Sequence, residues 1–211
     1  MNRIIHILQF VLKLNIVKSL YYSIRFGGRV FIGKGNIHIE GNGKIDFRTK
    51  ASSLFIGVYH TIPTATTITL MQNARLVVGA NAKIHRGTKI VVHEGGTLEI
   101  GDRTYINELA RVHCRKNITI GNDCAIAWST NILDTDLHTI YDEAGQPINT
   151  DQAIHIGNNV WIGANTTVLK GTCIEDNSII AAQSVVHGKV EGNYIYAGNP
   201  LKQIKTFATW N

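Results

Sequence analysis

Residues 134–138 form the segment of the chain best suited to acid–base chemistry, because Asp134 and Asp136 stand close to His138. A neutral imidazole accepts a proton readily near pH 7. His138 could therefore act as a general base toward a hydroxyl group. Asp136 could orient the imidazole, although a solvated loop acid fits its position equally well.

Trp161 is the second unusual residue. Alternation within residues 156–165 points its side chain outward from a strand of small residues. A large aromatic side chain on a flat outer surface is normally covered by a ligand or a second subunit. Trp161 therefore predicts a binding surface, or alternatively a contact between subunits.

A six-residue repeat surrounds these residues. In four blocks, every sixth residue is Ile or Val, and the residue two positions earlier is small or aliphatic. Period two within each hexad indicates a short strand with two inward side chains. The fifteen Ile and Val positions are Val78, Ile84, Ile90, Ile100, Ile106, Val112, Ile120, Ile126, Ile132, Ile156, Ile162, Val168, Ile174, Ile180 and Val186.

The repeat predicts an all-β solenoid. Turn-forming residues follow many of the strands, as in Gly101-Asp102 and Gly157-Asn158. Three hexads, about 18 residues, would form one coil of a triangular prism, with parallel coils stacked about 4.8 Å apart. Extra residues then leave at corners, the longest excursion being residues 134–153. Beyond the last strand, residues 194–197, we expect a turn and a short helix over residues 201–209.

The chain carries 21 Lys and Arg against 15 Asp and Glu, and the excess lies within residues 1–50. Residues 1–27 predict a basic, apolar-rich helix that either caps the prism or, through residues 1–20, lies on an anionic membrane surface. The sequence shows no basic stripe with interleaved aromatic residues, so it does not indicate nucleic-acid binding. With no apolar run of about 20 residues and no CxxC spacing, we expect a cytoplasmic chain, peripheral at the inner face of the membrane if the helix is an anchor.

The hexads resemble those of the hexapeptide-repeat acyltransferases, whose fold is a left-handed parallel β-helix. Three segments in order, residues 134–140, 156–165 and 197–205, resemble the branch of capsule and O-antigen O-acetyltransferases, including the polysialic acid capsule enzymes. The resemblance implies one acyltransferase domain over residues 28–211 with a tail from residue 198. It also implies a homotrimer, acetyl-CoA as co-substrate, a sugar or glycan acceptor and no metal.

Roles for individual residues follow from the same resemblance. His138 is implied as the catalytic base, with Asp136 and Trp161 beside the reacting groups, and Asn107 and Asp134 are implied to bind the acceptor. Coenzyme contacts are implied for Trp161, Ala164, Ala182, Lys202 and Lys205. Galactoside-type enzymes carry acids where this chain has His113-Cys114-Arg115, so a galactoside acceptor is not expected.

Three other functions stay open at this point. An N-acetyltransferase of a nucleotide-linked amino sugar would need a similar base. A γ-type carbonic anhydrase would bind zinc with three histidines across a subunit interface, but no His-x4-His pair is present here. A noncatalytic scaffold would have no need for the His138 excursion near Trp161.

Overall fold

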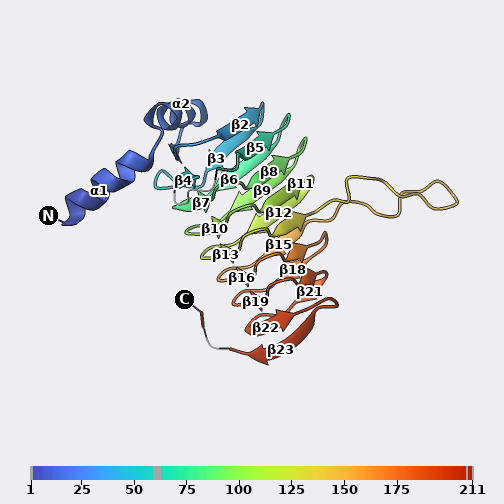
Figure 1. The fold of residues 1–211 in the computed structure, drawn as a ribbon. Helices are drawn as coiled ribbons and strands as arrows, with labels where there is room; N and C mark the ends of the chain where they lie inside the picture. Colours follow the sequence, from blue (N-terminus) through green and yellow to red (C-terminus); the bar gives the residue numbers. More distant parts are fainter. Residues whose placement is uncertain (1, 59–62, 208, 211) are drawn as a thin grey trace.

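The computed structural model describes residues 2–58, 63–207 and 209–210, and it is a parallel β-helix with three flat faces (Figure 1). This confirms the predicted fold class. The first face contains β1 (Arg29–Ile32), β4 (Ser53–Ile56), β7 (Ala82–Ile84), β10 (Tyr105–Ile106), β13 (Ala125–Ile126), β16 (Trp161–Ile162), β19 (Ile179–Ile180), β22 (Tyr194–Ala197) and β23 (Lys202–Thr206).

The other two faces are parallel throughout, because each strand pairs with the equivalent strands of the coils before and after it. The second face contains β2 (Ile37–Gly41), β5 (Thr66–Leu70), β8 (Lys89–Val92), β11 (Arg111–Cys114), β14 (Asn131–Leu133), β17 (Thr167–Val168) and β20 (Val185–Val186). The third contains β3 (Lys44–Phe47), β6 (Arg75–Val78), β9 (Thr97–Ile100), β12 (Asn117–Ile120), β15 (Ile154–Ile156), β18 (Cys173–Ile174) and β21 (Lys189–Val190).

The core is the column of inward side chains that the hexads predict. All fifteen Ile and Val positions are 0% exposed, and the fifteen residues two positions earlier are at most 1% exposed. Inward hydroxyls are satisfied by backbone carbonyls: Thr104 donates to the oxygen of Gly121 at 2.6 Å, and Ser178 donates to that of Glu175 at 2.7 Å. The prism is therefore filled by side chains, and ligands must bind outside it.

The corner between the third and first faces carries an Asp or Asn, which follows a glycine at Asp102, Asn122 and Asn158 and follows Glu175 at Asp176. Each of these side chains accepts a backbone N–H from the coil before it: Asn122 from Asp102 at 2.8 Å, Asn158 from Asn122 at 2.8 Å and Asp176 from Asn158 at 2.6 Å. A Cβ at Gly121 would lie 2.5 Å from the carbonyl oxygen of Gly157 in the next coil. Glycine is required there because the backbones approach so closely.

The N-terminal segment is two helices, α1 (Asn2–Lys13) and α2 (Ile16–Phe26), where the sequence predicted one. The break occurs at Asn15, whose backbone N–H donates to Ile32 of β1 at 2.7 Å while its side chain accepts from the N–H of Lys18 at 3.0 Å. Asn15 is thus the N-cap of α2. Within the described residues, neither helix is long and apolar enough to cross a membrane.

The prediction of a C-terminal helix over residues 201–209 is wrong. Residues 202–206 form β23, which pairs antiparallel with β22, as Ala197 with Lys202 and Ile195 with Lys205. β22 belongs to the last coil, so no further coil follows to satisfy the backbone groups along its outer edge. The returning chain satisfies them instead, because buried or edge N–H and C=O groups need partners.

We predict that inward and outward neighbours on β12 differ sharply in their contribution to stability. Ile120→Ala leaves a cavity in the filled column and should lower the free energy of unfolding by about 2–5 kcal/mol in chemical denaturation. Thr119→Ala, on the outer side of the same strand, should change it by less than about 0.5 kcal/mol. Equal losses in the two variants would show that the prism interior is not the stabilising core.

Candidate active site

The excursion leaves the prism after β14 on the second face and returns at β15 on the third (Figure 1). Asp136, at its base, accepts hydrogen bonds from the ammonium group of Lys170 and, at 2.8 Å, from the amide of Asn149. These bonds lower the pKa of Asp136, the lysine contributing most. Lys170 also donates to the carbonyl oxygen of Asn149 at 2.7 Å, so it holds the outgoing and returning segments of the excursion together.

His138 is held through its backbone. The amide Nδ2 of Asn149 donates to the carbonyl oxygen of His138 at 2.9 Å, and its Oδ1 accepts from the N–H of Ile140 at 2.6 Å. The imidazole itself is exposed and has no hydrogen-bond partner among the described residues. Asp136 therefore fixes the backbone around His138 through Asn149, and its described hydrogen bonds go to Lys170 and Asn149 instead of to the ring.

Asp134 is not available to bind an acceptor, contrary to expectation. Its side chain is fully buried and accepts from the backbone N–H groups of Arg115 and Lys116 at 2.7 and 2.8 Å. The alternation of β14 continues past the strand, so Asp134 points inward like Ile132. Its carboxylate satisfies two N–H groups of the preceding coil where the excursion interrupts the ladder, which is a structural role.

Two half-buried histidines, His93 and His113, lie on the second face close to the base of the excursion. Their ring centroids are 5.9 Å apart, and the Nε2 of His93 and the Nδ1 of His113 are buried without partners. Burial lowers the pKa of His93, helped by Arg115, and burial lowers the pKa of His113, helped by His93. Both rings are therefore held neutral. No three metal-binding side chains gather anywhere in the described residues.

A separate aromatic hollow of about 210 Å³ lies on the first face. Trp161 is 43% exposed, and its ring lies 6.0 Å from that of Trp210, whose indole N–H donates to Asn159 at 3.0 Å. The hollow is lined by Tyr105, Asn107, Ala125, Ala127, Trp128, Trp161 and Trp210. Apolar walls with few polar groups are typical of ligand sites.

Asn107 contributes its side-chain amide to the lining of this hollow. Its Oδ1 accepts from the backbone N–H of Glu108 at 2.9 Å and lies 2.9 Å from the Nδ1 of His85. His85 in turn stacks on Tyr105 with ring centroids 5.8 Å apart. Because the amide oxygen is used twice, the amide NH2 is the group that Asn107 can offer to a ligand.

The predicted coenzyme residues follow the first face and its corner with the second. Ala164 and Ala182 occupy equivalent positions in adjacent coils, since Gln183 donates to the carbonyl of Ala164 at 2.8 Å. Lys202 and Lys205 are exposed on β23, in the same sheet as Trp161. The structure thus gathers the predicted coenzyme residues along one side of the prism.

Within one chain, the predicted site falls into two parts. His138 lies on the excursion at the corner of the second and third faces, whereas Trp161 and Asn107 lie on the first face. The sequence analysis missed Tyr105, Trp128 and Trp210. Tyr105 could have been found, because period two places it on the outer side beside Asn107, but nothing in the repeat indicates that Trp210 returns to this face.

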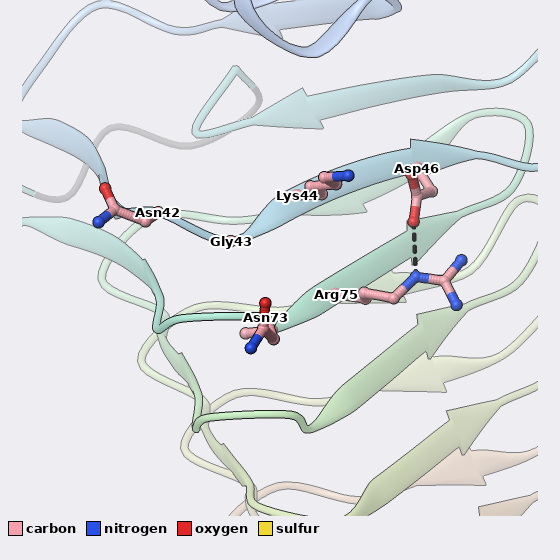
Figure 2. Close-up of a pocket in the computed structure, with 7 residues that line it drawn as sticks. Asn42, Gly43, Lys44, Asp46, Asn73 and Arg75 are labelled. Carbon is pink, nitrogen blue, oxygen red and sulfur yellow. Dashed lines mark hydrogen bonds and ion pairs between the residues drawn. The ribbon is translucent and has the colours of Figure 1, made fainter.

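Another hollow, of about 440 Å³, contains none of the predicted site residues. Figure 2 shows it on the third face, among Asn42, Lys44 and Asn73, with the ion pair of Arg75 and Asp46 along one side. That pair, at 2.8 Å, already neutralises both charges. Lys44 is the remaining charged residue of this lining, and no imidazole of the kind that His138 provides lies there.

We predict that His93 and His113 make the fold less stable in acid. Their folded pKa values lie below the unfolded value near 6.5, so the unfolded chain binds more protons and stability falls as the pH drops through that value. The thermal midpoint should therefore decrease between about pH 7 and pH 5. A His93→Gln/His113→Gln variant should lose part of this slope, whereas the exposed control His187→Gln should keep it. An unchanged slope in the double variant would contradict the assignment.

Comparison with known proteins agrees with the fold and its repeat. The family described as "Bacterial transferase hexapeptide (six repeats)" matches residues 153–188. A putative lipopolysaccharide biosynthesis O-acetyltransferase of Escherichia coli K12 is 29% identical over 140 residues, which span 61% of this chain and 70% of the relative. A polysialic acid O-acetyltransferase of Escherichia coli O1:K1 is 34% identical over 134 residues, which span 61% of this chain and 44% of the relative.

Solved structures extend the likeness to most of the chain. The structure of a polysialic acid O-acetyltransferase superposes with a TM-score of 0.68 at 26% identity, covering 83% of this chain and 90% of that one. A second polysialic acid-specific acetyltransferase superposes with a TM-score of 0.57 at 27% identity. In its repeat, its fold and these relatives, the chain is similar to the hexapeptide-repeat acetyltransferases.

Proposed function

We propose that the protein transfers an acetyl group from acetyl-CoA to a hydroxyl of a sugar in a bacterial surface polysaccharide or its precursor. The observation that carries the proposal is the exposed, unpartnered imidazole of His138 on an excursion braced by Asp136, Asn149 and Lys170. The lipopolysaccharide and polysialic acid O-acetyltransferases among the relatives support an oxygen acceptor on a glycan.

His138 would take the proton of the acceptor hydroxyl as its oxygen attacks the acetyl carbonyl carbon. A C–O bond forms, the C–S bond breaks, and the proton passes from His138 to the departing thiolate. A backbone N–H would stabilise the charge that develops on the carbonyl oxygen. The reaction needs no acyl-enzyme, and burial raises the pKa of the Cys124 thiol to about 11, which makes it a poor nucleophile.

The site is completed by a second copy of the chain in a homotrimer. His138 and the aromatic hollow lie on different sides of one prism, so the excursion of one protomer must approach the first face of its neighbour. A cyclic arrangement brings these two different surfaces together at every interface. Such packing would also cover Trp161.

The hollow then divides between the two substrates. Trp161 and the small side chains of Ala164 and Ala182 would border the pantetheine arm, and Lys202 and Lys205 would face the coenzyme phosphates. The free amide NH2 of Asn107 would donate to an acceptor oxygen. Coenzyme A release across a panel of bacterial glycans, sugar nucleotides and amino-sugar nucleotides tests the acceptor class. Release only with amino-sugar nucleotides would replace O-acetylation with N-acetylation.

We predict that His138→Ala lowers kcat by about 10²–10⁴-fold, the usual contribution of a positioned general base. The fold, the molecular mass of the assembly and the acetyl-CoA affinity should stay unchanged, because the imidazole makes no hydrogen bond with the part of the chain that the structure describes. His187→Ala, an exposed histidine of the second face, is the matched control and should keep full activity. Wild-type turnover by His138→Ala would remove it as the base.

Mixed trimers test the composite site. His138→Ala and Trp161→Ala homotrimers should both be impaired, each in every site. When the two variants are refolded together in equal amounts, about a quarter of the interfaces should pair an intact His138 with an intact Trp161. Activity should therefore rise well above that of either variant alone. No recovery in verified mixed trimers would show that both residues act within one protomer.

A further inference from the structure

Helix α2 is oriented with its apolar face away from the protein. Toward the body it presents Ser19 and Ser23, whose hydroxyls accept the backbone N–H groups of Ile32 and Val30 at 2.9 and 3.0 Å. The opposite face is almost wholly apolar and exposed, with Val17 at 79% and Ile24 at 73%. The remaining members of this face are Ile16, Leu20 and Tyr21.

Helix α1 continues this surface. Phe10 packs against Phe31 and Phe55, with ring centroids 6.1 Å away in both cases, and so marks the side that faces the body. Among the other side chains of this helix that the structure describes, five large apolar ones are exposed: Ile5, Ile7, Leu8, Val11 and Leu12. A helix that only capped the prism would bury its apolar residues against it. These two helices bury only a few apolar residues against the body, among them Tyr22, and leave most of them exposed; the exposed residues of both are called here the apolar surface.

The charged side chains of residues 1–39, which include both helices, are of one sign. The first acidic residue of the chain is Glu40, whereas Lys13, Lys18, Arg25, Arg29 and Lys34 all precede it. Lys18 donates to the carbonyl of Ile37 at 2.9 Å and Arg25 to that of Gly41 at 2.7 Å, which places both cations at the border between the apolar surface and the body. A second copy of this segment would add like charges, whereas anionic headgroups would neutralise these.

We propose that α1 and α2 bind the surface of a bilayer containing anionic phospholipids, with the apolar surface among the acyl chains and the cations at the headgroups. The helices lie at one end of the prism (Figure 1). The strands of the first face run β1-β4-β7-β10-β13-β16, so the aromatic hollow lies about 15–25 Å along the stack from β1, the strand next to α2. Membrane binding would use the end of the prism opposite β23, and this inference does not rest on the proposed function.

Co-sedimentation of the full chain with vesicles tests the proposal. The protein should bind vesicles of phosphatidylcholine mixed with phosphatidylglycerol about tenfold or more tightly than vesicles of phosphatidylcholine alone. Val17→Ser/Leu20→Ser/Ile24→Ser should abolish this binding without unfolding the chain, because all three side chains point away from the body. Ile204→Ser, an exposed apolar residue of β23, is the control and should bind like wild type.

Three results would overturn the proposal. The triple variant could bind vesicles as well as wild type, or the two vesicle types could bind equally. Alternatively, the wild-type protein could bind neither type of vesicle, and the triple variant could have a different molecular mass from wild type in light scattering. That result would make the apolar surface a contact between copies of the chain. Because coenzyme A release is measured separately, a failure here is distinguishable from a failure of acetyl transfer.

Discussion

Close approach of successive backbones at the corner between the third and first faces is the constraint on which the structure depends. The Asp or Asn at this corner accepts a backbone N–H from the coil before, and this hydrogen bond fixes the position at which successive coils turn. Except at Asp176, a glycine precedes the Asp or Asn, since a Cβ at Gly157 would lie 2.3 Å from Asp176. With this corner fixed, the strands on all three faces stay in register and every inward position falls on one column.

A filled prism leaves no internal cavity, so the chemistry has to be built on the outside. The protein does this in two ways. On the first face, small residues such as Ala125 and Ala127 leave room between larger aromatics, which creates the hollow. At the opposite corner, the excursion carries His138 beyond the repeat, where its position is set by hydrogen bonds and an ion pair instead of by strand pairing. The regular coils thus give a rigid support to two different surfaces, the aromatic hollow on the first face and the excursion that carries His138.

The core could be predicted almost residue by residue, because a period of six fixes which side chains point inward. The same alternation, continued past β14, places Asp134 inside, whereas the sequence analysis gave it a role in binding the acceptor. The helix break at Asn15 and the strand β23 could not be predicted from local patterns. Both depend on unpaired backbone groups of β1 and β22, which only the assembled coils reveal. Trp210 reaches the hollow by the same return of the chain.

The strand β23 has a consequence for how molecules meet end to end. A stack of parallel coils is open-ended, and its last strands are templates on which another chain could polymerise into a fibre. Antiparallel β23 covers the edge of β22 on which a parallel coil of another molecule would otherwise pair. The last strands of the other faces, β20 and β21, are two residues each, with Lys189 on β21. The prism therefore carries its own stop against fibrous growth at the C-terminal end.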